Sequence, residues 1–218
     1  MMRPLIQKTC AFIAAAVLLS ACQHTQMSND AQHRVTVKDE RTLGYFDVLG
    51  THSEKPQESS QYVRKLYGQN AQKQWVLQDF YHPSNSPQTS VFALYDERGL
   101  YDWDSLQFSD GKVSFFESDG TKTSTIIMNK GTPVGKREYY LPNGRVYKTQ
   151  TFDEQGEVLI ESYVDEQNKV FFKFNHQTHE STFFDAKNKA YTNVEENIEL
   201  YQQSIEKVLE LEAQTGKY

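Results

Sequence analysis

Cysteine is scarce in this sequence, and both thiols, Cys10 and Cys22, lie near the N-terminus. From Gln23 onward the chain therefore has no disulfide, no thiol nucleophile and no cysteine-based metal site. Long apolar runs are also missing, because the one clear run, residues 11–19, is too short to span a bilayer as a helix. The hydrolase motif Gly-x-Ser-x-Gly and the zinc motif His-Glu-x-x-His do not occur. The sequence therefore predicts a protein that is not an enzyme and has no cofactor.

Basic residues are too few for a nucleic-acid-binding protein. The chain has 23 Lys and Arg against 29 Asp and Glu, a formal net charge of −6. Removal of the first 21 residues would take away Arg3 and Lys8 and bring the net charge to −8. Nucleic acid needs a basic footprint and anionic lipid needs a polybasic patch, so neither is an expected partner. The acidity favours solubility.

The first 22 residues have the pattern of a targeting segment. Two basic residues precede the apolar run, and Leu-Ser-Ala-Cys follows at residues 19–22. This tetrapeptide resembles the lipobox of bacterial lipoproteins, and the resemblance implies cleavage of a signal peptide, residues 1–21, between Ala21 and Cys22, with acylation of Cys22. Each buried CH₂ of the acyl chains contributes about 0.8 kcal/mol, so two or three chains anchor a protein stably. The alternative is an ordinary signal peptide with an incidental cysteine.

The expected location is the bacterial outer membrane. Gln23, and not Asp, follows Cys22, which by the same resemblance implies export beyond the inner membrane. Residues 22–41 are polar and lack an apolar period, which predicts a flexible tether with a reach of roughly 25 Å. The mature protein is then lipid-anchored and faces either the periplasm or the cell surface.

Recurring glycines and aromatics predict short antiparallel strands over residues 42–192. Tyr and Phe number 13 each, and glycines recur roughly every 12 residues, a spacing typical of hairpin turns. The predicted repeat turns use Gly99, Gly111, Gly120, Gly131, Gly135, Asn143, Gly144 and Gly156. The predicted strands lie at about 44–50, 75–81, 91–96, 103–108, 112–117, 122–128, 136–141, 145–152, 157–164, 169–174 and 180–185. The pattern of residues 62–67 fits a strand or one helical turn.

The stretch 131–144 is the clearest unit. Its closing Asn143-Gly144 predicts a two-residue type I′ hairpin, which needs a positive φ at both positions. Phe115-Phe116 and Gly120 match Tyr139-Tyr140 and Gly144 at an offset of 24 residues. A fixed period of this length indicates a repeat architecture.

This unit resembles the bacterial MORN-variant repeat, whose pattern is roughly Gly-x-x-x-Gly-x-x-x-Tyr-Tyr-x-x-Asn-Gly-x-Leu. The matching residues are Gly131, Gly135, Tyr139, Tyr140, Asn143, Gly144 and Val146. The resemblance covers about residues 91–175 and implies an elongated single-layer sheet of successive hairpins, with no shared active site. The region around Trp75 resembles the segment that precedes the repeats in similar lipoproteins, and we interpret it as the N-terminal cap of the sheet.

The chain end, residues 193–218, has the period of an amphipathic helix. The apolar stripe comprises Val194, Ile198, Tyr201, Ile205, Val208 and Leu209, with Leu211 off the main stripe. Thr192 and Glu195 form a predicted capping box, and Gly216 is a predicted stop. The helix either covers the sheet of its own chain, which we favour, or docks another chain. The expected fold is thus mostly β, an antiparallel single layer of hairpins with a C-terminal amphipathic helix.

Three candidate chemical sites are weak. Residues 131–136 are similar to a phosphate-binding loop, but one residue is missing and Arg137 replaces the Ser or Thr that holds magnesium. His176 and His179 supply two ligands, and a zinc site needs three or four, so no metal is expected. Asp102-Trp103-Asp104 places two carboxylates beside an indole. In a strand these carboxylates would share a face and could bind a cation or a sugar hydroxyl, although a solvated face is the more common outcome.

The predicted function is that of a non-catalytic scaffold or protein-binding module. An extended aromatic sheet offers a broad face for docking and edges for strand addition. The protein partner is not identified by the sequence. Two alternatives stay open. Some MORN-variant proteins are immunity or antitoxin-like neutralisers, and the resemblance extends that role to this chain. The other is a glycan- or peptidoglycan-binding module that uses Trp103.

Overall fold

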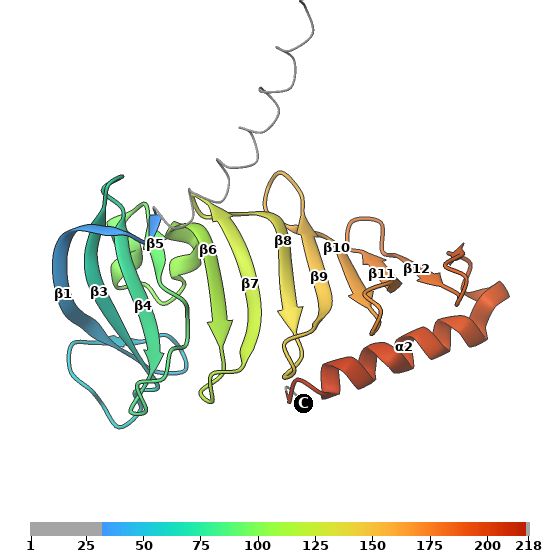
Figure 1. The fold of residues 1–218 in the computed structure, drawn as a ribbon, viewed down its shortest axis with the longest axis horizontal. Coiled ribbons are helices and arrows are strands. Elements are labelled where there is room, and N and C mark those ends of the chain that lie inside the picture. The colour runs from blue at the N-terminus through green and yellow to red at the C-terminus, as the bar shows by residue number, and fades with distance from the viewer. Residues whose placement is uncertain (1–31, 217–218) are drawn as a thin grey trace, which may run out of the picture.

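The computed structural model describes residues 32–216 as one antiparallel sheet of 13 strands with a single long helix near its C-terminal end (Figure 1). The strands follow one another across the sheet in chain order, apart from a short strand at the edge beside the first. This confirms the predicted fold class, mostly β with an open single layer and a C-terminal helix. Ala21, Cys22 and the first half of the expected tether, residues 22–31, lie outside the described residues.

The strands are β1 Val35–Phe46, β2 His52–Ser53, β3 Tyr62–Asn70, β4 Trp75–Tyr81, β5 Phe92–Leu94, β6 Ser109–Phe116, β7 Lys122–Asn129, β8 Thr132–Tyr140, β9 Val146–Phe152, β10 Val158–Val164, β11 Val170–Asn175, β12 Glu180–Phe184 and β13 Ala190–Tyr191. The helix α2 is Ile198–Ala213, and the 3₁₀-helices are η1 Glu97–Leu100, η2 Ser105–Phe108 and η3 Glu195–Asn197.

Three local predictions need correction or completion. The first strand begins at Val35, inside the expected tether, because its backbone pairs with β3 from Val35 and Asn70 onward. Three register shifts in that pairing break the period-two alternation that would have revealed the strand. Residues 62–67 are strand. The strand predicted at 103–108 is wrong, because residues 105–108 form η2.

The Asn143-Gly144 turn is not type I′. Gly144 has φ +80°, but Asn143 is not among the residues with positive φ. The amide of Leu141 donates to the carbonyl of Arg145 at 2.9 Å, and that of Gly144 to Leu141 at 2.8 Å. This is a three-residue loop, a type I turn followed by one left-handed residue. The type I′ geometry occurs one hairpin earlier, where Lys130 (φ +45°) and Gly131 (φ +83°) link β7 to β8.

The same three-residue loop closes hairpins along the whole sheet, with the same two backbone hydrogen bonds. The residues at its left-handed position are Gly50, Lys73, Gly120, Gly144, Gly156, Asn168 and Asn188. Positions 120, 144 and 168 continue the offset of 24 residues seen in the sequence. The repeat therefore reflects one recurring turn geometry, in which Asn replaces Gly toward the C-terminus.

Three of the predicted turn glycines are not in hairpin turns. Gly99 is buried in η1, where an added Cβ would lie 2.8 Å from the Cβ of Phe108, so its small size serves packing. Gly111 (φ +93°) lies inside β6. Gly135 (φ +69°) lies inside β8, where the register with β7 shifts. Gly111 and Gly135 therefore allow local irregularities in β6 and β8 that need a positive φ.

Direct cross-strand partners share a face of the sheet, and two adjacent rows define the two faces of β6–β12. We call one the aromatic face; its row is Phe115, Ser124, Tyr139, Lys148, Tyr163, Phe172 and Phe183. We call the other the polar face; its row is Ser114, Thr125, Glu138, Thr149, Ser162, Lys173 and Thr182. No residue of the polar row belongs to either hydrophobic cluster of the protein.

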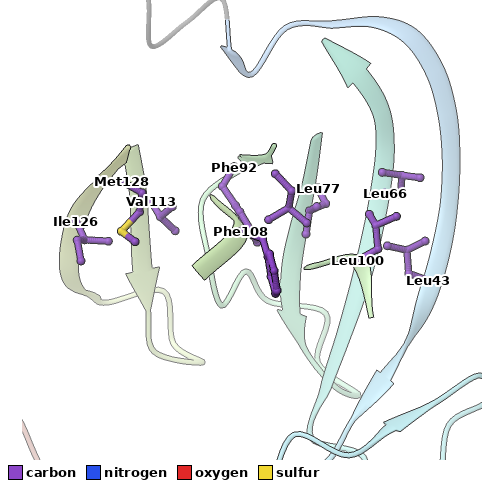
Figure 2. Packing of buried hydrophobic residues seen from close by; sticks show 10 residues of the cluster. Leu43, Leu66, Leu77, Phe92, Leu100, Phe108, Val113, Ile126 and Met128 are labelled. Atoms are coloured by element: carbon purple, nitrogen blue, oxygen red, sulfur yellow. The ribbon is translucent and has the colours of Figure 1, made fainter. Parts of the chain in front are cut away.

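The first hydrophobic cluster lies under η1 and η2. Figure 2 shows Leu100 and Phe108, from the 3₁₀-helices, among the side chains of the N-terminal strands. The buried members are Leu43, Leu66, Leu77, Phe92, Leu94, Leu100, Phe108, Val113, Ile126 and Met128. Phe115, from the aromatic row, packs against this cluster. The two 3₁₀-helices therefore cover the N-terminal part of the aromatic face.

The second cluster lies between α2 and the C-terminal strands. Tyr163, Phe172 and Phe183 from the aromatic row pack there with Leu211, Ile205 and Val208 from the helix. The helix thus covers its own sheet, as we favoured. The stripe is rotated from the predicted one, because Leu211 is buried whereas Leu209 is 57% exposed and Ile198 is 46% exposed.

The predicted capping box is absent. Asn193 Oδ1, and not Thr192, accepts a hydrogen bond from the amide of Glu196 at 3.2 Å. A one-turn 3₁₀-helix, η3, precedes α2, and this moves the helix start past the residues of the predicted box. Gly216 has φ +68° just beyond the helix, in keeping with its predicted role as a stop.

A buried carboxylate fixes α2 to the sheet. Glu212 accepts hydrogen bonds from the phenols of Tyr147 and Tyr163, each at 3.0 Å, and pairs with Lys148 Nζ. Burial raises the pKa of the Glu212 carboxyl, but the hydrogen bond and charge of Lys148, with the two phenols, outweigh burial and leave that pKa below its usual value. Burial and the nearby carboxylates raise the pKa of both phenols, so they stay protonated donors.

We expect Gly144→Val to destabilise the protein by about 1–3 kcal/mol, because a β-branched residue is strained at positive φ. No atom lies within 4 Å of the added Cβ, so strain alone is responsible. Gly144→Asn is the control, since Asn168 and Asn188 occupy the same loop position, and it should cost much less. Thermal unfolding measures both. Equal melting temperatures for Gly144→Val and the native chain would contradict the turn geometry.

We expect Glu212→Gln to lower the free energy of unfolding by about 1–3 kcal/mol at neutral pH, because the mostly buried ammonium group of Lys148 loses its counter-charge. The pKa of Glu212 is lower in the folded than in the unfolded protein. Its contribution to stability is therefore complete at pH values above the usual pKa of glutamate, and it is lost as the pH falls through the folded-state pKa. The difference in melting temperature between the native chain and the variant should therefore shrink in acid. Glu206→Gln, exposed on the same helix, is the control. A pH-independent difference would refute this role.

Candidate functional site

A buried arginine organises the N-terminal end of the sheet. The Arg64 side chain, from β3, is 0% exposed and forms a two-point ion pair with Asp79 on β4, with Nε–Oδ1 2.7 Å and Nη2–Oδ2 2.8 Å. Nη2 also donates to Ser105 Oγ at 3.1 Å. Nη1 donates to the carbonyls of Gly99 at 2.8 Å and Asp102 at 2.7 Å. All five N–H groups of the guanidinium thus have partners.

These contacts fold residues 97–105 over the aromatic face. Two loop carbonyls and one hydroxyl converge on the single guanidinium, which lies 5.0 Å from the ring of Phe46 and 5.8 Å from that of Trp103. Trp103 stacks on Tyr62 with ring centroids 4.5 Å apart. The position of Trp103 therefore follows from the ion pair beneath it.

Trp103 separates two hollows. The outer one, which we call the Trp103 cleft, is about 510 Å³ and is lined by Leu49, Gly50, His52, Arg98 and residues 101–104. The inner one is about 340 Å³ and reaches Asp79, Gln88 and Phe115. Asp104 lines both. Aromatic, acidic and apolar groups therefore meet here around open volume.

The Asp102-Trp103-Asp104 triplet is a loop between η1 and η2, not a strand. Asp102 Oδ1 accepts from the amide of Asp104 at 2.9 Å, which turns the chain so that the two carboxylates do not share a sheet face. Both residues still line the Trp103 cleft. Arg98, on the same cleft, is matched by Asp96 at 2.6 Å.

The other sequence candidates do not form sites. Residues 131–136 are a tight turn and the start of β8, with no helix after them. His176 and His179 lie on the β11–β12 loop and contact the ring of Phe174. Each candidate therefore has a structural role.

Sequence reasoning missed Arg64. A signal was present, because the ambiguous segment 62–67 carries a charged residue between apolar ones and the confident strand 75–81 carries Asp79. In the structure Arg64 of β3 and Asp79 of β4 are direct cross-strand partners, which brings these two charged residues together. Within residues 32–216 no group of three or more His, Cys, Asp or Glu has the spacing to hold a metal ion. No helix of that region is both long and apolar enough to cross a membrane.

Comparisons with known proteins leave the chain without a family. No family model and no curated protein matches it. Among solved structures, a TarM crystal structure is 9% identical with a TM-score of 0.34, over 79% of this chain and 24% of that one. An S. aureus TarM mutant with fondaparinux, alpha-GlcNAc-glycerol and UDP is 10% identical with a TM-score of 0.32, over 75% of this chain and 24% of that one.

A GtfA/B complex bound to UDP and GlcNAc is 10% identical with a TM-score of 0.25, over 60% of this chain and 25% of that one. The chain thus spans about a quarter of the length of each of these structures. Likeness at these TM-scores defines neither a common fold nor a common activity.

We expect Arg64→Met to destabilise the protein by about 3–5 kcal/mol, because it leaves Asp79 buried without its counter-charge. The same change should release residues 97–105 from the sheet, since their carbonyls lose a common donor. Denaturant unfolding measures the first effect and Trp fluorescence the second. Arg98→Met, which breaks an exposed ion pair, is the control and should change stability little. Similar midpoints for the two variants would refute the role of Arg64.

Proposed function

We propose that this protein is an outer-membrane lipoprotein, anchored through Cys22, that acts as a non-catalytic scaffold or protein-binding module through its sheet. The anchor is supported by the Leu-Ser-Ala-Cys pattern and the preceding basic and apolar segments. The first strand begins at Val35, so only a short span separates it from Cys22. This shorter tether holds the sheet close to the membrane surface.

The observation that carries the binding role is the asymmetry of the sheet. The aromatic face is covered by η1, η2 and α2, whereas the polar row on the opposite face joins neither cluster. Antiparallel sheets of enzymes and of binding proteins alike can leave one face wet. Here the polar face extends over seven strands, β6–β12, and so offers a broad, continuous surface on which a partner can dock.

The edges of the sheet are less suited to a partner than its surfaces. The outer edge of β1 is paired with β2 only at Tyr45 and Phe46, but its free part carries charged residues at positions 38–41 and three register shifts. The opposite edge, β13, has two residues. Charges, bulges and short edge strands are features that oppose strand addition. Docking on a surface is therefore the mode of binding that we propose, in place of strand addition.

Site-specific crosslinking in cells tests this function. A photo-reactive residue at Thr149 or Ser162, on the polar face, should give a discrete adduct with one envelope protein. Cys22→Ser should move the protein out of the membrane fraction and abolish the adduct, because the anchor places the sheet beside its partner.

A photo-reactive residue at Val208, on the side of α2 that packs against the sheet, is the matched control and should give no adduct. Membrane fractionation of Cys22→Ser that is unchanged from the native chain would rule out the lipid anchor. Absence of any adduct from the polar face would rule out the scaffold role.

A further inference from the structure

One of the repeated turns is chemically unlike the others. All seven three-residue loops need a left-handed third position, whereas the type I turn before it accepts most residues at its two central positions, with proline favoured at the first. In six loops these two are Ala71-Gln72, Ser118-Asp119, Pro142-Asn143, Glu154-Gln155, Glu166-Gln167 and Ala186-Lys187. In the loop after β1 they are Val48-Leu49. Two aliphatic residues at such a tip are not explained by folding.

Both aliphatic side chains are exposed, Val48 to 68% and Leu49 to 86%. The loop that carries them is held in place, because Asp47 Oδ1 accepts from the amides of Leu49 at 2.9 Å and Thr51 at 2.8 Å. Gly50, the third residue, contacts Trp103, and an added Cβ there would lie 2.8 Å from the Trp103 Cβ. The apolar tip is therefore fixed against the Trp103 cleft.

The cleft beside this tip is acidic and partly aromatic. Asp102 and Asp104 line it, and no hydrogen bond within residues 32–216 reaches the Asp104 carboxylate. The one nearby arginine, Arg98, is already matched by Asp96. Tyr101 is 51% exposed on the same wall. Such a surface complements a ligand that carries a cation next to an apolar group.

We propose that the Trp103 cleft and the Val48-Leu49 tip bind a peptide segment of a protein partner in which a basic side chain neighbours an aliphatic one. The basic group lies against Tyr101 and the carboxylates of Asp102 and Asp104. The aliphatic group packs on Leu49 and Val48. This inference rests on the proposed protein-binding function, and it adds a second contact surface, separate from the polar face, for a partner segment of stated chemistry.

Two other classes of ligand fit less well. A saccharide would use the aromatic rings and the carboxylates but would gain nothing from two exposed aliphatic side chains. An anionic membrane surface would gain from the aliphatic tip but would be repelled by the acidic cleft. Charge and apolarity together select the basic, aliphatic peptide.

Calorimetric titration of the full mature protein in detergent tests the site. The probes are a Leu-Lys-Leu-Lys peptide, its Leu-Glu-Leu-Glu counterpart, a soluble peptidoglycan fragment and phosphatidylglycerol vesicles. The lysine peptide should bind, and Leu49→Ser and Asp104→Asn should each weaken it at least tenfold. Lys187→Ser, a change at the corresponding tip position of the turn after Asp185, should leave binding unchanged.

Equal binding of the lysine and glutamate peptides, or unchanged binding by Leu49→Ser and Asp104→Asn, overturns the inference. Binding of the peptidoglycan fragment or the vesicles in place of the peptide overturns it as well. Crosslinking in cells separates this failure from that of the proposed function. An adduct from Thr149 on the polar face, with none from a photo-reactive residue at Leu49, leaves the scaffold role intact and removes only the peptide site.

Discussion

The guanidinium of Arg64 is the constraint on which the N-terminal half of the molecule depends. A charge buried this deeply is costly unless every donor is paired, and here Asp79, Ser105 and the carbonyls of Gly99 and Asp102 supply the partners. Carbonyl groups of residues 99 and 102 complete this set of partners. The hydrogen bonds of Arg64 are therefore all formed only when residues 97–105 fold over the sheet. The first hydrophobic cluster and the Trp103 cleft are consequences, since Leu100 and Trp103 belong to the same loop.

The C-terminal half solves a related problem with the opposite charge. There the buried charge is on the helix that covers the sheet. Glu212 of α2 pairs with Lys148 and accepts hydrogen bonds from Tyr147 and Tyr163 of the sheet. Both ions lie on the aromatic face, which explains why the two covers are on one side. A single layer has two faces, and within residues 32–216 both hydrophobic clusters and both of these ions lie on the aromatic side. The polar face is left for solvent or for a partner.

Much of the fold was predictable from sequence, and the misses have physical causes. Glycine spacing and aromatic alternation gave the hairpins, and the helix period gave α2. The type I′ assignment at Asn143-Gly144 was wrong because Pro142 and Asn143 complete a type I turn, so only Gly144 needs positive φ. Gly99 was misread because a packing glycine and a turn glycine are identical in sequence. The site was harder still, because Arg64 and residues 99–105 are joined only in three dimensions.

The recurring turn also provides an internal reference for function. Seven loops share one hydrogen-bonding scheme, so that scheme does not account for the differences among their tips. Six have polar, small or proline residues at the tip, which reflects exposure to water, and one presents Val48-Leu49. Exposed aliphatic side chains lower solubility and promote aggregation. The charged residues 38–41 at the edge of β1 have the opposite effect, because they oppose association. The apolar tip, held by Asp47 beside an acidic cleft, is therefore the feature on which our proposal of a bound peptide depends.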